Sequence, residues 1–161
     1  MAGLAIGKRL PLGFAGAISQ GSDIVAVNRA CTEAIAFGGA VSLASDNTVS
    51  NTQPSNLSGF IGFALRVATA KSQTQDYMAG DLVDIVTRGA VCVPFTGNTT
   101  PNAGDPVFLR VSSGGFGHSN AQMGSVTAEG GSGTIQLPNA VFRTGIVDDG
   151  LVEILLTHRR I

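Results

Sequence analysis

Residues 79–85 read Ala-Gly-Asp-Leu-Val-Asp-Ile, and residues 103–109 repeat this pattern as Ala-Gly-Asp-Pro-Val-Phe-Leu. Glycine tolerates positive φ, and an aspartate carboxylate can accept a hydrogen bond from a nearby backbone N–H, so each Gly-Asp pair predicts a tight turn. The alternating apolar residues that follow each turn predict a strand. The repeat therefore indicates a domain built from turn-and-strand units. The structural turn residues that we expect are Gly80, Asp81, Gly104 and Asp105.

The composition indicates one domain with many turns and a weakly charged surface. The chain has 161 residues, of which 22 are Gly and 13% are charged, and it has a net charge of −1. Its hydrophobic content of 43% is high, so we expect part of the apolar surface to meet another protein. The charge balance argues against a nucleic-acid partner, because such binding normally needs a basic face. No apolar run is long enough to cross a membrane.

Apolar residues alternate with period 2 from Asp23 onward, with turn signals between the segments. This pattern predicts an all-β fold, a single compact β-barrel or β-sandwich of about eight to ten short strands. Residues 32–37 fit either one helical turn or an extended segment. We expect polar loops at 45–58 and 112–133. We expect two strands at 82–87 and 90–95 to pair as a hairpin around Arg88-Gly89. The other expected strands are 25–29, 40–43, 59–69, 107–111, 134–137, 140–147 and 151–157.

Residues 1–22 differ from the β-domain that we expect at 23–161. They show no sustained period of 2 or 3.6, so we expect an extended N-terminal arm. A terminal segment of this kind is either a disordered tail or an arm that becomes ordered on a partner. Its apolar residues favour the arm, since disordered tails are usually poor in them. The partner-binding residues that we expect are Leu4, Ile6, Lys8, Arg9, Leu10, Leu12 and Phe14.

Candidate catalytic groups are few, and we expect no enzymatic activity, cofactor or metal. The chain has two histidines, His118 and His158, and neither belongs to a nucleophile or metal motif. Asp148-Asp149 precedes Gly150, which is typical of a solvated turn rather than an acid–base pair. Cys31 and Cys92 do not make a disulfide framework, and we recognise no export signal, so we expect synthesis in the cytoplasm.

Four segments occur in an order that resembles the cement, or decoration, proteins of tailed bacteriophage heads. They are residues 34–43, 59–65, 77–93 and 103–108, and the likeness extends over about residues 23–157. The resemblance implies a β-domain on the outside of the virion head that bridges neighbouring major capsid proteins. It transfers no catalytic residue. We also expect a homo-oligomer, either a dimer or a trimer, on the capsid.

Two other classes share parts of this composition. A phage tail or baseplate β-module would have the same turns and strands. A small hydrolase or carbohydrate-binding domain is less compatible, because sugar-binding surfaces usually stack on aromatic rings and the chain has no Trp and one Tyr. We therefore expect a structural cement protein of a phage head.

Overall fold

The structure is a computed structural model that describes residues 13–44, 47–51, 57–67, 76–112, 124–145 and 147–157. It confirms the all-β prediction. No helix in these ranges is long and apolar enough to span a membrane. The strands are β1 (Ile18–Ala30), β2 (Ile35–Ala36), β3 (Ala40–Leu43), β4 (Val49–Ser50), β5 (Phe60–Ala64), β6 (Asp76–Tyr77), β7 (Leu82–Pro94), β8 (Pro106–Arg110), β9 (Val126–Thr127), β10 (Thr134–Phe142) and β11 (Leu151–Leu156).

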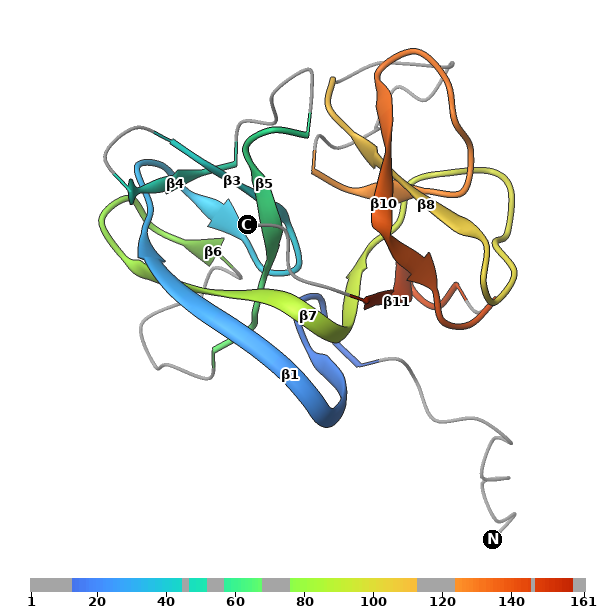
Figure 1. The fold of residues 1–161 in the computed structure, drawn as a ribbon, viewed down its shortest axis with the longest axis horizontal. Coiled ribbons are helices and arrows are strands. Elements are labelled where there is room, and N and C mark those ends of the chain that lie inside the picture. The colour runs from blue at the N-terminus through green and yellow to red at the C-terminus, as the bar shows by residue number, and fades with distance from the viewer. Residues whose placement is uncertain are drawn as a thin grey trace, which may run out of the picture.

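One curled sheet forms most of the fold. Its order is β4-β3-β5-β7-β11-β10-β8-β9, with β1 paired to β7 beside this path, while β2 and β6 make a separate ladder. The sheet curls at both ends, where Cys31 bridges Val49 of β4 and Phe95 bridges Val126 of β9. The result is two lobes, which Figure 1 shows side by side, with β1–β6 in one and β8–β11 in the other.

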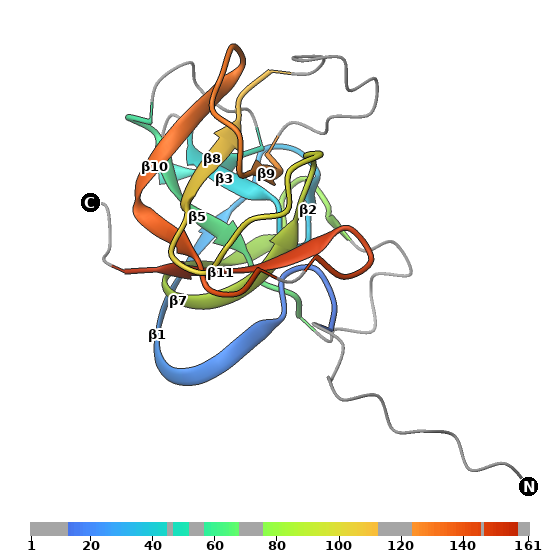
Figure 2. The same ribbon diagram turned by 90° about the vertical axis from the view of Figure 1, so that its right-hand side faces the viewer.

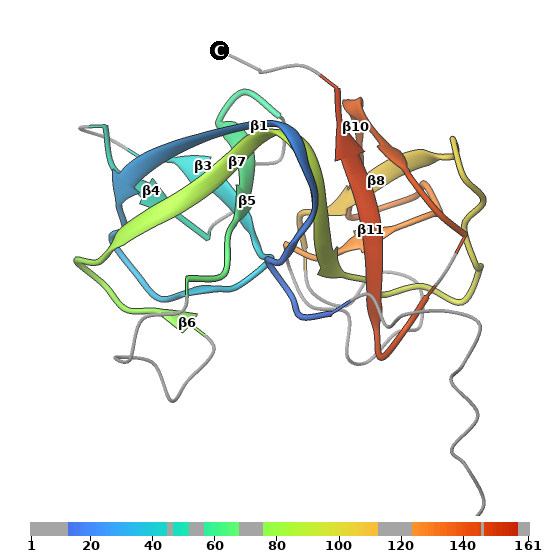
Figure 3. The same cartoon turned by 90° about the horizontal axis from the view of Figure 1, so that it is seen from below.

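Strand β7 belongs to both lobes. Its first half pairs with β5 through Val86, and its second half pairs with β11 from Gly89 to Pro94. Strand β1 follows β7 along its other side, and Figure 3 shows both strands passing from one lobe to the other. The predicted hairpin at Arg88-Gly89 is therefore wrong. Gly89 has a φ of +124°, but the strand bends there instead of reversing, because both halves keep neighbours on either side.

Several element boundaries differ from the sequence prediction. Strand β1 begins at Ile18, inside the segment expected as an arm. Short strands β4 and β9 lie within the predicted loops 45–58 and 112–133, where too few residues alternate to reveal them. The segments 134–137 and 140–147 are largely one strand, β10, whose register against β8 shifts between Leu137 and Val141. Residues 32–37 contain the extended strand β2.

The core consists of two apolar clusters on opposite faces of β5 and β7. The smaller cluster fills the first lobe and includes Ile35, Val41 and Ile85. The larger one includes Phe63 and Val86 together with the interior of the second lobe. Because successive strand residues point to opposite faces, Ile85 and Val86 serve different clusters. The central strands are thus buried on both sides, and the two lobes pack together as one body.

The sequence repeat is also a structural repeat. Gly80 and Gly104 have φ of +91° and +90°. The Asp81 N–H donates to the Met78 carbonyl at 2.9 Å, and the Met78 N–H donates to the Asp81 carboxylate at 2.9 Å. Asp105 makes the same two contacts with Asn102, at 3.1 and 2.7 Å. The two Gly-Asp pairs therefore form the same four-residue turn before β7 and before β8.

Replacing Gly80 or Gly104 by Val should lower the free energy of unfolding by about 1–3 kcal/mol, because a β-branched residue is strained at positive φ. No atom of the described residues lies within 4 Å of the place that a Cβ would take at either position, so we expect the loss to come from the backbone alone. Gly→Asn is the matched control, since Asn tolerates this conformation better. Thermal melts followed by circular dichroism measure both. Equal losses for Val and Asn would contradict the explanation.

Candidate interaction surface

Five large apolar side chains are exposed among the described residues. Phe14 is 60% exposed and Ile18 is 48% exposed, and both fall in the segment predicted as an arm. Met78 and Leu82 flank the first Gly-Asp turn at 57% and 67% exposure, and Leu43 ends β3 at 45%. Exposed apolar side chains that cluster near a chain end are candidates for contact with another protein.

The backbone around Gly16 fixes the point where the N-terminal segment joins the fold. The Gly16 N–H donates to the Cys92 carbonyl at 2.8 Å, and the Gly16 carbonyl accepts from the Arg66 N–H at 2.9 Å. A Cβ at Gly16 would lie 2.7–2.9 Å from three backbone atoms, of Arg66, Ala64 and Gly38. Only a glycine fits this crossing, so the chain is held in place from residue 16 onward.

Phe14 projects from this crossing onto a stack of side chains. The Arg66 guanidinium lies 4.4 Å from the centroid of the Phe14 ring and 5.7 Å from that of Phe37. The Phe37 ring meets Tyr77 edge-on, with centroids 5.2 Å apart, and the Tyr77 hydroxyl donates to the Leu65 carbonyl at 2.7 Å. A cation over an aromatic face is attractive. Arg66 therefore holds an exposed Phe14 at a defined place.

The remaining predicted arm residues lie outside the described residues: Leu4, Ile6, Lys8, Arg9, Leu10 and Leu12. The structure corrects the arm at its other end. Residues 18–22 belong to β1, and Ile18 pairs with Val91. The predicted boundary of the arm at residue 22 is thus wrong, because the chain is bonded to the β-domain from Gly16 onward. Alternation was hard to recognise there, because the register of β1 against β7 shifts three times between Ile18 and Ala26.

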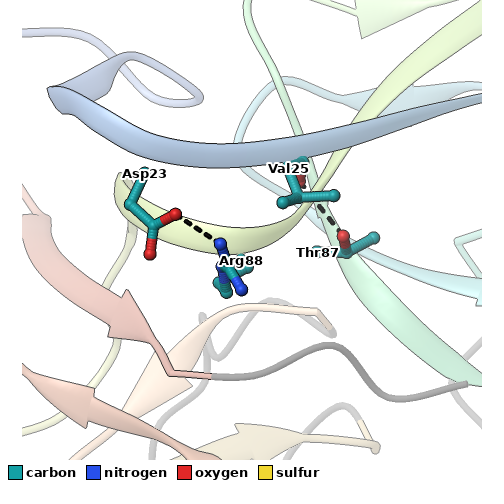
Figure 4. Close-up of polar contacts among 4 residues, drawn as sticks. All are labelled: Asp23, Val25, Thr87 and Arg88. Carbon is teal, nitrogen blue, oxygen red and sulfur yellow. Dashed lines mark hydrogen bonds and ion pairs between the residues drawn. The ribbon is translucent and has the colours of Figure 1, made fainter.

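A groove of about 230 Å³ lies where β7 bends. It lies between Asp23 in β1, residues 88–90 in β7 and residues 155–157 at the end of β11. Asp23 forms an ion pair with Arg88, and the Thr87 hydroxyl donates to the Val25 carbonyl at 3.1 Å, as Figure 4 shows. Both charged side chains are partly exposed, so the pair adds little stability and mainly ties β1 to the bend.

The acidic pair and the cysteines considered as catalytic candidates lie in a turn and in the core. Asp148 N–H and C=O pair with Leu151, and Asp149 and Gly150 have φ of 50° and 70°, which makes a two-residue hairpin turn. Cys31 and Cys92 are buried free thiols. Burial raises the pKa of the Cys92 thiol to about 11, so it is protonated near neutral pH and is a poor nucleophile. His118 and His158 lie outside the described residues.

Two buried charged residues were missed by sequence reasoning. Glu153 alternates in sequence with the apolar residues Val152 and Ile154, which is the pattern of a solvent-facing position, yet it is 8% exposed. Its carboxylate accepts from Arg143 at 2.8 Å and from the Ser19 hydroxyl at 2.5 Å. Arg110 is 2% exposed and donates to the Thr96 carbonyl and hydroxyl. Nothing in an alternating pattern distinguishes these positions from solvent-facing ones. In the described ranges, no three His, Cys, Asp or Glu side chains gather as metal ligands would.

The candidate surface thus combines an anchored N-terminal segment with exposed apolar residues, and comparison with known proteins identifies its family. Residues 4–157 match the phage family described as structural cement protein (E217 gp24/Pam3 gp6). The chain belongs to the phage structural cement protein family. A chain from a structure titled "The capsid of Myoviridae Phage XM1" has the same fold, with a TM-score of 0.75, 16% identity and 98% of both chains covered. A comparison with curated proteins finds no match.

This membership confirms the predicted class. The cement protein is a structural component of the phage virion and not an enzyme, as its family is. The alternatives of a tail or baseplate module and of a hydrolase or carbohydrate-binding domain have no such support. The match begins at residue 4, so it includes most of the N-terminal segment.

We expect Gly16→Ala to destabilise the cement protein by about 2–4 kcal/mol, since the added methyl would overlap three backbone atoms at positive φ. Gly13→Ala is the control, because Gly13 also has positive φ, but among the described residues the one atom within 4 Å of its added methyl would be the Ala17 Cβ, at 3.9 Å. Chemical denaturation of the two variants and the wild type measures the difference. A Gly16→Ala variant as stable as Gly13→Ala would show that the crossing is not tightly packed.

Proposed function

We propose that this cement protein binds the outer surface of a phage head and bridges neighbouring major capsid proteins, with its N-terminal arm supplying much of the contact. The observation that carries this proposal is Phe14. It stands 60% exposed at the base of the arm, stacked on Arg66, two residues before the fixed crossing at Gly16. An apolar ring held in solvent at this position gains free energy once a partner covers it.

The energetics favour apolar burial over charge pairing. Burying a large apolar side chain is worth roughly 1.5–3 kcal/mol, whereas an exposed ion pair of Lys8 or Arg9 would add at most about 1 kcal/mol. Ordering each arm residue costs about 1–2 kcal/mol of chain entropy. The arm therefore needs main-chain pairing with the partner as well, as in strand addition to a sheet edge. Because Gly16 is already fixed, the residues next to it lose less entropy on binding.

A structural cement also gains from repetition. Many copies each making modest contacts hold a shell together by avidity, without one strong site. The two-lobed body is rigid, and the arm begins at the Gly16 crossing. This arrangement suits a contact that crosses from one capsid subunit to the next. The family membership and the capsid origin of the similar fold support this role.

Deleting residues 2–12 should abolish or strongly reduce binding to undecorated heads and leave the melting temperature of the isolated protein unchanged. The deletion stops at residue 12 because Gly16 and Ile18 are part of the fold. Cosedimentation with heads at low and high salt measures binding, and we expect the loss at both salt concentrations, since apolar contacts are not screened.

Two further variants sharpen this experiment. Deletion of residues 2–20 should lower the melting temperature, because it removes the crossing and the first pairs of β1. Phe14→Ala should weaken head binding without changing folding, whereas Leu43→Ala removes a comparably exposed apolar side chain elsewhere and should not. Normal decoration by the 2–12 deletion would mean that the two lobes alone bind the capsid.

A further inference from the structure

The two Gly-Asp turns share a backbone conformation but carry different side chains. Residues 76–84 read Asp-Tyr-Met-Ala-Gly-Asp-Leu-Val-Asp, and the equivalent residues 100–108 read Thr-Pro-Asn-Ala-Gly-Asp-Pro-Val-Phe. The second turn therefore has Thr100, Asn102 and Pro106 where the first has an aspartate, a methionine and a leucine. Because the same turn forms with either set, the apolar and acidic side chains of the first turn are not needed to make it.

The apolar side chains of the first turn are in solvent. Met78 is 57% exposed and Leu82 is 67% exposed, and residues 79–81 between them are exposed as well. Figures 1 and 3 place the start of β7 at the end of the first lobe that lies away from the second lobe, and Figure 2 is viewed from the opposite end, with β8 and β10 in front. One exposed leucine is ordinary, but two large apolar side chains on one turn form a patch that a partner can cover.

The side chains around this patch are acidic. Asp76 and Met78 point outward on either side of the buried Tyr77, since successive strand residues alternate between faces. The Asp76 carboxylate makes no ion pair with a described residue. The Asp81 carboxylate accepts the Met78 N–H at 2.9 Å, and Asp81 is exposed. The patch therefore carries negative charge beside its apolar side chains.

The described cations of the first lobe are directed elsewhere. Arg29 lies opposite Val83, which is buried in this lobe, so it is on the other face of the β1–β7 ladder from Leu82. Arg66 lies over two phenylalanine rings, and Arg88 belongs to the ion pair at the bend of β7. Charge complementarity thus favours a partner surface that presents lysine or arginine beside an apolar side chain.

The first turn is also continuous with the surface at the base of the arm. Phe14 is stacked on Arg66, which also lies over Phe37. The Phe37 ring meets Tyr77 edge-on, and Met78 follows directly in the chain. A partner that covers the exposed Phe14 therefore lies close to the first turn.

We propose that the turn patch, which consists of Asp76, Met78, Asp81 and Leu82, is a second contact with the major capsid protein. Its two apolar side chains pack against an apolar side chain of a capsid subunit, and its carboxylates face lysine or arginine residues beside it. This inference rests on the proposed function, because it takes the capsid protein as the partner. It adds a contact on the rigid body of the cement protein to the contact made by the arm.

Photo-cross-linking on decorated heads tests the identity of the partner. In the full-length protein, Leu82→p-benzoylphenylalanine should give a product that joins one cement chain to one major capsid subunit. Pro106→p-benzoylphenylalanine is the matched control, since it occupies the equivalent position of the second turn, and it should give little of this product. A product that joins only two cement chains would assign the patch to a second copy and overturn the proposal, as would equal capsid products from both positions.

Cosedimentation with undecorated heads measures what the patch contributes. Met78→Asn/Leu82→Thr should raise the dissociation constant for heads at least about tenfold, whereas Asn102→Ala/Pro106→Ala, at the equivalent positions of the second turn, should leave it unchanged. All four side chains are exposed, so we expect unchanged melting temperatures. If the wild type binds heads and Met78→Asn/Leu82→Thr binds equally well, this inference alone is overturned. A wild type that does not bind heads would overturn the proposed function and this contact with it.

Charge reversal at Asp76 tests the chemistry of the partner. Asp76→Lys should raise the dissociation constant at least about tenfold at low salt and much less at high salt, because exposed charges are screened. The loss caused by Met78→Asn/Leu82→Thr should persist at both salt concentrations. Thr100→Lys is the control in the second turn and should leave binding unchanged. An Asp76→Lys variant that binds heads as tightly as the wild type at low salt would exclude a basic partner surface and overturn the proposal.

Discussion

The continuity of β7 through its bend at Gly89 is the constraint on which the other elements depend. The registers of β1, β5 and β11 are all set against this strand. Ile24 of β1 packs so closely over the bend that a Cβ at Gly89 would lie 3.0 Å from its side chain. A residue with a side chain would therefore push β1 away from β7 at the point where the two lobes meet.

Apolar burial rather than charge holds the two lobes together. The larger cluster contains residues from β3 and β5 of the first lobe and from β8, β10 and β11 of the second, together with residues of β7, which belongs to both lobes. The partly buried ion pair between Arg143 and Glu153 adds polar contacts. The Ser19 hydroxyl donates to the same Glu153 carboxylate, so this carboxylate also holds the start of β1. Removing one member of such a pair would leave a buried charge uncompensated, so these contacts favour one arrangement of β1 over others.

This construction explains how a small β-protein can serve as a structural cement. The body is stiff because its central strands are buried on both faces, and the N-terminal segment leaves it from a backbone crossing that does not admit a side chain at Gly16. The hydrogen bond from the Gly16 N–H to the Cys92 carbonyl ties this crossing directly to β7. Few surface charges and several exposed apolar residues fit contacts that tolerate salt.

The sequence by itself determined the class of fold and the turns. Alternation and the repeated Ala-Gly-Asp predicted an all-β domain, and the strand at Ala40–Leu43 and the turns at Gly80 and Gly104 lie where local pattern places them. These features depend on φ preferences and side-chain period within a few residues.

Only the tertiary structure decided that Arg88-Gly89 is a bend within one strand, that Ile18 begins β1 and that Glu153 is buried. Each of these depends on a neighbour that is distant in sequence: Ile24 over Gly89, Val91 beside Ile18, and Arg143 and Ser19 on Glu153. A local pattern cannot encode such partners, because the same Gly and Glu residues would suit a turn or a solvated face equally well.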